Sequence, residues 1–201
     1  MRIQFRRREI GECVSVIYRS DGVVLELPSY SRMYRVPHDL AHAVTERELR
    51  MAGGVYGLIA SGHVFGNMTV VSGRPRHDAK ARSDRVMKAY GRSITTAELL
   101  AGTVHRAVES GQCDDLYQQL IRAWGSLETD PFPWTAQDVR TTRDTMREHD
   151  QRWQRVAVGT RWSLTGRTRW SAPSHRPFGG SFGARACRAP MISARELAER
   201  P

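Results

Sequence analysis

Cysteine is scarce and scattered in this sequence. The chain has three cysteines, Cys13, Cys113 and Cys187, and no Cys-x-x-Cys pair. Such spacing predicts neither a disulfide framework nor a zinc knuckle, and isolated thiols are typical of proteins in a reducing compartment. We therefore expect a cytoplasmic protein without disulfide bonds.

Long apolar runs are also missing. The N-terminus reads Met-Arg-Ile-Gln-Phe-Arg-Arg-Arg, with no apolar stretch of signal-peptide length behind it. Nowhere do about 18 apolar residues follow one another, which is the length that a membrane-spanning helix needs. The sequence thus predicts a soluble, unsecreted protein with no membrane partner.

The motifs of two common enzyme classes are absent. No Gly-x-Ser-x-Gly surrounds a candidate nucleophile, and Ser61 lies in a small-residue-rich segment where serine far more often packs than reacts. The chain has no Gly-x-x-x-x-Gly-Lys-Ser/Thr, and Gly57, Gly62 and Gly66 lack the spacing of a dinucleotide-binding loop. Serine hydrolysis and nucleotide binding are both disfavoured.

The chain is basic yet almost free of lysine. Lysine and arginine number 31 against 21 aspartates and glutamates, a formal net charge of +10, but only Lys80 and Lys88 are lysines. Excess positive charge attracts nucleic acid, acidic proteins or anionic lipid surfaces. A GC-rich genome, however, produces arginine without any selection for phosphate binding. Charge therefore indicates a class of partner and not a site.

Alternating apolar residues at the start of the chain predict an antiparallel sheet. Such runs lie at residues 3–5, 13–18 and 23–27. Asp21 and Gly22 separate the last two runs and give the signal of a two-residue hairpin turn. Pro28 is expected to end the strand that follows. The alternating segment 158–165 is expected to return to this sheet as an edge strand.

Helical periodicity fills the middle of the chain. We expect helices at residues 37–51, within 55–66, and at 95–110, 116–124 and 135–155. Thr95 with Glu98 resembles a capped helix start, and so does Thr135 with Asp138. The segment 72–83 has several breakers and no apolar period, which predicts a basic exposed loop. The fold class is therefore α+β, an N-terminal antiparallel sheet packed with about four to five helices.

The composition changes after Gly166. Arginine, proline and glycine replace aliphatic residues, so this segment cannot bury enough apolar surface to offset its ordering entropy. We expect one α+β domain over residues 1–166 and a disordered basic tail over 167–201. From Arg161 onward the chain has eight arginines against two glutamates, a net of +6. A binding module that contacts nucleic acid or an acidic protein through this Arg-rich tail is one hypothesis for function.

The helix expected at 37–51 carries the one pattern that suggests chemistry. At about 100° per residue, Leu40, Val44 and Met51 share a narrow arc, while His38 and His42 lie on another arc well away from it. The apolar arc should cover the sheet. The side chains on the other arc should form a functional site or face solvent.

Histidines four residues apart on a helix can place two imidazoles on one metal ion, as in the His-Glu-x-x-His zinc proteases. Here Asp39 replaces that glutamate and is one methylene shorter, so it aims differently at a metal-bound water. Glu46 lies about 12 Å along the helix from His38 at ~1.5 Å per residue, too far to complete a single-metal set. We predict a divalent metal such as zinc on His38 and His42, with hydrolysis as the associated activity and Asp39 or Glu46 as candidate catalytic groups. The third ligand stays open among four residues: His63, His77, Asp78 and His105.

Two other interpretations of this helix remain open. In the first, His38 or Asp39 caps the helix and His42 pairs with Glu46, so that the histidines have a structural role. In the second, the same groups carry acid/base chemistry without a metal. The pattern does not decide whether the protein is an enzyme.

The motif Pro-His-Asp-Leu-x-His at residues 37–42, with Glu46 after it and a β-hairpin before it, resembles a family of small bacterial proteins. That family carries the same motif and has no established function, so the resemblance implies kinship and no activity. It covers roughly residues 1 to 166. Thr45 departs from the apolar residue expected at its position. Three residues of the last helix and strand also fit the family: Trp153, Gly159 and Leu164.

Overall fold

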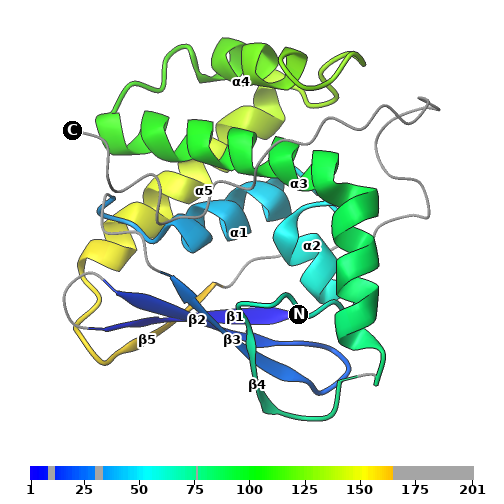
Figure 1. Cartoon of the computed structure of the whole chain (residues 1–201). Coiled ribbons are helices and arrows are strands. Elements are labelled where there is room, and N and C mark those ends of the chain that lie inside the picture. Colours follow the sequence, from blue (N-terminus) through cyan, green and yellow to red (C-terminus); the bar gives the residue numbers. More distant parts are fainter. Residues whose placement is uncertain (9–11, 30–33, 76, 165–201) are drawn as a thin grey trace, which may run out of the picture.

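The structure, a computed structural model, describes residues 1–8, 12–29, 34–75 and 77–164 (Figure 1). The boundary expected at residue 166 and the tail expected to be disordered lie outside these residues. Both stay predictions, as do the tail's expected partners.

One antiparallel sheet forms the base of the molecule. Its strands follow the order β4-β3-β2-β1-β5. Their bounds are β1 Arg2–Arg7, β2 Cys13–Tyr18, β3 Val24–Ser29, β4 Thr69–Ser72 and β5 Arg161–Leu164. The last strand pairs with β1, with Ile3 opposite Leu164. The predicted return of the chain to the sheet edge is therefore confirmed.

Five helices pack above this sheet in the part of the chain that the structure describes. They are α1 His38–Glu48, α2 Val55–Ala60, α3 Ala79–Ser110, α4 Leu116–Gly125 and α5 Ala136–Gln154. In Figure 1, α1, α2 and α5 lie next to the sheet, and α3 and α4 cover them. The α+β class is confirmed. Within the described residues, no helix combines the length and the apolar character that crossing a membrane requires.

The hairpin between β2 and β3 forms where expected, but with a longer turn. The backbone N–H of Arg19 donates to the carbonyl of Val23 at 3.0 Å, which encloses the three residues 20–22. Gly22 alone supplies a positive φ, 81°, in this loop. The two-residue type I′ turn that Asp-Gly favours would need positive φ at both central positions, whereas a three-residue loop needs it only at the last, where glycine stands.

Pro28 does not end β3, contrary to the prediction. It pairs with Val14 of β2, and β3 continues to Ser29. On its other side, β3 pairs with β4 only from Val24 to Glu26. The missing N–H of Pro28 therefore costs no ladder hydrogen bond to β4.

The loop expected at 72–83 is partly helix, because α3 begins at Ala79 and not near Thr95. Ala79 and Ser83 are buried, and the Ser83 hydroxyl accepts the backbone N–H of Val64 at 3.0 Å. Inside the helix, the Thr95 hydroxyl donates to the carbonyl of Gly91 at 2.9 Å. Threonine bonds of this kind and glycine both favour helix bending. Figure 1 shows that α3 does change direction between its two halves.

The central helix α1 is buried on both arcs. Leu40 and Val44 are fully buried on the apolar arc, as expected. His42 and Glu46 are also buried, with only 4% and 1% of their surface exposed. The polar arc therefore faces the interior between α1 and α3.

A buried histidine in α5 makes the fold acid-sensitive. His149 is 3% exposed, its ring lies 4.7 Å from that of Trp162 between centroids, and neither ring nitrogen has a hydrogen-bond partner among the described residues. Burial, reinforced by the charges of Arg47 and Arg152, lowers the pKa of His149 to about 4. The unfolded chain takes up this proton near its ordinary pKa of 6.5. Stability is therefore lost as pH falls from 6.5 towards 4.

We expect His149 to account for a loss of about 1 to 3 kcal/mol in the free energy of unfolding across that pH range. His149→Leu should keep the apolar contact and remove this part of the acid dependence. Denaturant unfolding of both proteins at several pH values between 4 and 6.5 measures the difference. Equal acid sensitivity of variant and wild type would contradict the assignment.

Candidate metal centre

The start of α1 sets the two histidines of the motif one turn apart. The carbonyl of Pro37 accepts the N–H groups of Leu40 at 3.0 Å and Ala41 at 3.3 Å. Among the described residues, no side-chain hydrogen bond caps this helix start. The interpretation in which His38 or Asp39 caps the helix is therefore wrong. The other part of that interpretation, the pairing of His42 with Glu46, is confirmed, because Nδ1 of His42 lies 3.3 Å from Oε1 of Glu46.

A glutamate of α3 completes the cluster. Oε2 of Glu98 lies 3.4 Å from Nε2 of His38 and 3.0 Å from Nε2 of His42. One ligand atom from each of the three residues lies within 4.8 Å of the other two. Ligands held about 2.0 to 2.1 Å from a tetrahedral zinc ion are ~3.3 Å apart. Glu98 thus lies at ligand spacing from each histidine, and the three atoms are close enough together to surround one ion.

Glu46 supports the cluster from behind. Its side chain is buried, and besides His42 it accepts the backbone N–H groups of Val55 at 3.1 Å, Tyr56 at 2.8 Å and Gly57 at 3.3 Å. These are the first N–H groups of α2, which no preceding turn can satisfy. The carboxylate therefore joins two parts of the fold: the imidazole of His42 within α1 and the start of α2.

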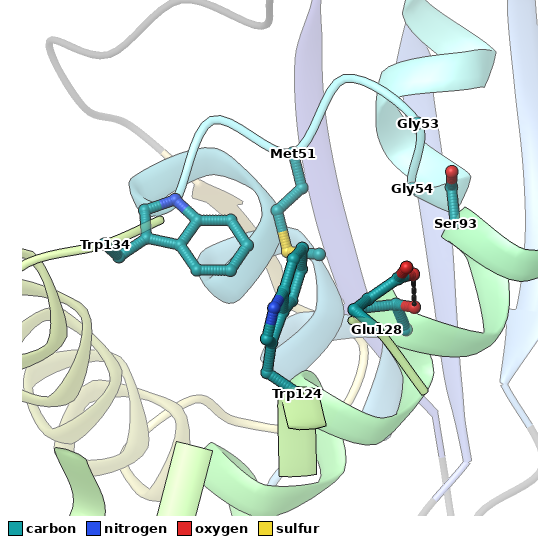
Figure 2. A pocket seen from close by; sticks show the side chains of 8 residues that line it. Met51, Gly53, Gly54, Ser93, Trp124, Glu128 and Trp134 are labelled. Carbon is teal, nitrogen blue, oxygen red and sulfur yellow. Dashed lines mark hydrogen bonds between the residues drawn. The ribbon is translucent and has the colours of Figure 1, made fainter. Parts of the chain in front are cut away.

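Gly54 leaves room for that carboxylate. A Cβ atom at this position would lie 2.4 Å from Cδ of Glu46. Gly54 also lines a pocket outside the cluster, shown in Figure 2, where the rings of Trp124 and Trp134 meet edge to face with centroids 5.4 Å apart. The other residues lining it are Met51, Gly53, Ser93, Thr96 and Glu128. His38, His42 and Glu98 are not among them.

The charges of the cluster favour a bound cation. Burial alone would lower the pKa of His42, but hydrogen bonds with Glu46 and Glu98 outweigh it and raise this pKa to about 10. Burial likewise acts to raise the pKa of Glu98, but His38 and His42 hold it well below its usual range. Two carboxylates thus share one protonated imidazole in the metal-free protein. A metal ion on Nε2 of His42 would take the place of that proton.

Asp39 lies on the sheet side of α1. Its Oδ2 is 3.5 Å from the hydroxyl of Ser15 in β2. Burial raises the pKa of Asp39 to about 6, against the opposing charges of His42 and His38. Burial, with the nearby Asp39 charge, also raises the pKa of the Cys13 thiol to about 12.

The structure brings His38 and His42 together with a candidate ligand, Glu98, that the sequence pattern did not predict. None of the four residues left open as third ligand belongs to the cluster, and Glu98 takes that place. One of the four, His105, lies next to the cluster, with its Nδ1 3.4 Å from Nδ1 of His38. The sequence did contain a signal, because Glu98 lies seven residues before His105 and therefore on the same face of a helix. Thr95, three residues before Glu98, made this glutamate resemble part of a helix cap instead.

Comparisons of the chain with protein-family models, with curated proteins and with solved structures found no match. The resemblance to the bacterial proteins with the Pro-His-Asp-Leu-x-His motif therefore stays a prediction.

Proposed function

We propose that this protein binds a divalent transition-metal ion, best matched by zinc, through His38, His42 and Glu98. The observation that carries the proposal is the approach of both Nε2 atoms to one oxygen of Glu98, at 3.4 and 3.0 Å. Two imidazoles and one carboxylate form a ligand set found in catalytic zinc sites. The buried Glu46 behind His42 is the kind of outer partner that orients a metal-binding imidazole.

The cluster is open on one side. The side chain of Glu98 is 52% exposed and that of His38 is 31% exposed, while His42 is buried. Catalytic zinc sites keep one such position free for water or substrate, whereas structural sites are closed by four protein ligands. Hydrolysis is the reaction class that this arrangement favours, because a bound ion would supply Lewis-acid chemistry there. Glu46, whose oxygens are occupied, serves to hold His42.

Wild-type protein, stripped of metal, is expected to bind about one equivalent of zinc in a titration against a chromogenic chelator. Glu98→Gln should bind at least about tenfold more weakly, because a neutral amide is a poor zinc ligand. Glu148→Gln, at an exposed glutamate of α5, is the matched control and should bind like wild type. A wild type that takes up neither zinc, manganese nor iron would end the proposal. In that case His42 has the structural role of a buried cation between two carboxylates.

A further inference from the structure

His105 lies beside the cluster without belonging to it. Its side chain is fully buried in α3, and the ring of Tyr34 covers it with centroids 4.1 Å apart. Nδ1 of His105 lies 3.4 Å from Nδ1 of His38, whose Nε2 faces Glu98. The two nitrogens of His38 therefore have different neighbours. His105 stands behind this ligand, on the side away from Glu98.

The other histidine of the cluster is arranged in the same way. His42 directs Nε2 to Glu98 and Nδ1 to the buried carboxylate of Glu46. An acceptor at Nδ1 fixes the proton there and leaves the lone pair of Nε2 free for a metal. For His38 the corresponding acceptor is an imidazole and not a carboxylate.

The carboxylate of Glu109 lies on the far side of His105 from His38. Nε2 of His105 is buried, lacks a hydrogen-bond partner among the described residues and lies 3.5 Å from Oε1 of Glu109. Glu109 is held in place, because Oε1 accepts the backbone N–H of Val36 at 3.0 Å and Oε2 lies 3.4 Å from Nε of Arg35. A proton on Nε2 of His105, facing this carboxylate, leaves its Nδ1 as an acceptor towards His38.

We propose that Glu109 and His105 form a relay that holds His38 in the tautomer able to bind a metal through Nε2. This inference rests on the proposed metal site. Glu109 accepts from Nε2–H of His105, and Nδ1 of His105 accepts from Nδ1–H of His38. The two contacts, 3.5 and 3.4 Å, exceed the usual hydrogen-bond length by about 0.4 to 0.6 Å, so the relay requires both rings to move closer by that amount when a metal binds. His105 is thus a positioning residue.

Two substitutions of His105 separate this role from simple packing. His105→Asn places an amide oxygen near the former Nδ1 and should bind zinc within a few-fold of wild type. His105→Leu fills the space without an acceptor and should bind about 10- to 100-fold more weakly, the usual loss for an outer-shell partner. Nitrogen-15 NMR of the zinc-loaded proteins should show the proton of His38 on Nδ1 in wild type and His105→Asn. Thermal melting of each metal-free variant checks that it folds.

The outcomes distinguish the relay from the metal site itself. A wild type that binds no zinc would overturn both. A wild type that binds zinc, together with a folded His105→Leu protein of equal affinity, would overturn the relay alone. So would a zinc-loaded wild type in which Nε2 of His38 carries the proton. If His105→Leu fails to fold, the His105→Asn affinity and the wild-type tautomer still decide the question.

Discussion

Replacing Glu46 by alanine is expected to lower the free energy of unfolding by about 3 to 5 kcal/mol, among the largest effects of any single substitution in this chain. The side chain is 1% exposed and accepts three backbone N–H groups at the start of α2. Alanine would leave these donors without a partner and His42 without its buried counter-charge. Each unsatisfied buried donor costs about 1 to 3 kcal/mol. Water that enters the space left by the side chain would bond to some of these donors and reduce the total loss.

Chemical denaturation of the metal-free proteins measures this loss. Glu46→Gln keeps an acceptor oxygen of the same reach and should lose roughly half as much, because only the charge is removed. Glu148→Ala removes an exposed glutamate that pairs with Arg152 on the surface of α5, and should change stability by less than about 1 kcal/mol. A Glu46→Ala protein as stable as the Glu148→Ala control would show that the three N–H groups of α2 do not depend on this carboxylate.

Local signals in the sequence were sufficient for much of the fold. Thr135 and Asp138 form the predicted capping box, in which the Thr135 hydroxyl accepts the N–H of Asp138 at 3.2 Å and Asp138 accepts the N–H of Thr135 at 2.8 Å. The helix after it buries Val139 and Met146, as its periodicity predicts. These features depend on residues three to seven positions apart, so they can be inferred without knowing the rest of the chain.

The same kind of signal was misleading at Thr95 and Glu98. A threonine followed by a glutamate three positions later resembles a helix start wherever it occurs. In α3 it lies mid-helix, because buried contacts of Ala79 and Ser83 extend the helix towards the N-terminus. Glu98 therefore does not cap a helix, and its Oε2 lies 3.0 Å from Nε2 of His42 in α1. That contact spans 56 positions, and no local pattern encodes it.

The burial of the polar arc of α1 also lay beyond the sequence pattern. Periodicity separates His42 from Leu40, but it cannot tell whether the polar face meets solvent or another helix. The position of α3 decides this. Because α3 covers α1, the charge of Glu46 is buried and is stabilised by the N–H groups of α2. The carboxylate can reach them only because Gly54 has no Cβ atom in its way. The candidate centre is therefore a product of tertiary packing around a motif that the sequence does reveal.

His42→Ala is expected to bind zinc at least about 100-fold more weakly than wild type, because it removes one ligand of the chelate and leaves Glu46 without its partner. Of the three cluster residues, His42 has the most buried site and both ring nitrogens in contact with carboxylates. His77→Ala is the matched control. His77 is an exposed histidine outside the cluster, and its removal should leave zinc affinity unchanged.

Elemental analysis of the three proteins, purified side by side without chelator, gives the first measurement, and zinc titration of the stripped proteins gives the second. If the site binds metal, wild type and His77→Ala contain it and His42→Ala does not. A structural role for His42 predicts a different pattern: no stoichiometric metal in any of the three, with a loss of stability confined to His42→Ala. Equal metal content in His42→Ala and wild type would contradict the proposed ligand set, since a chelate on α1 requires both of its imidazoles.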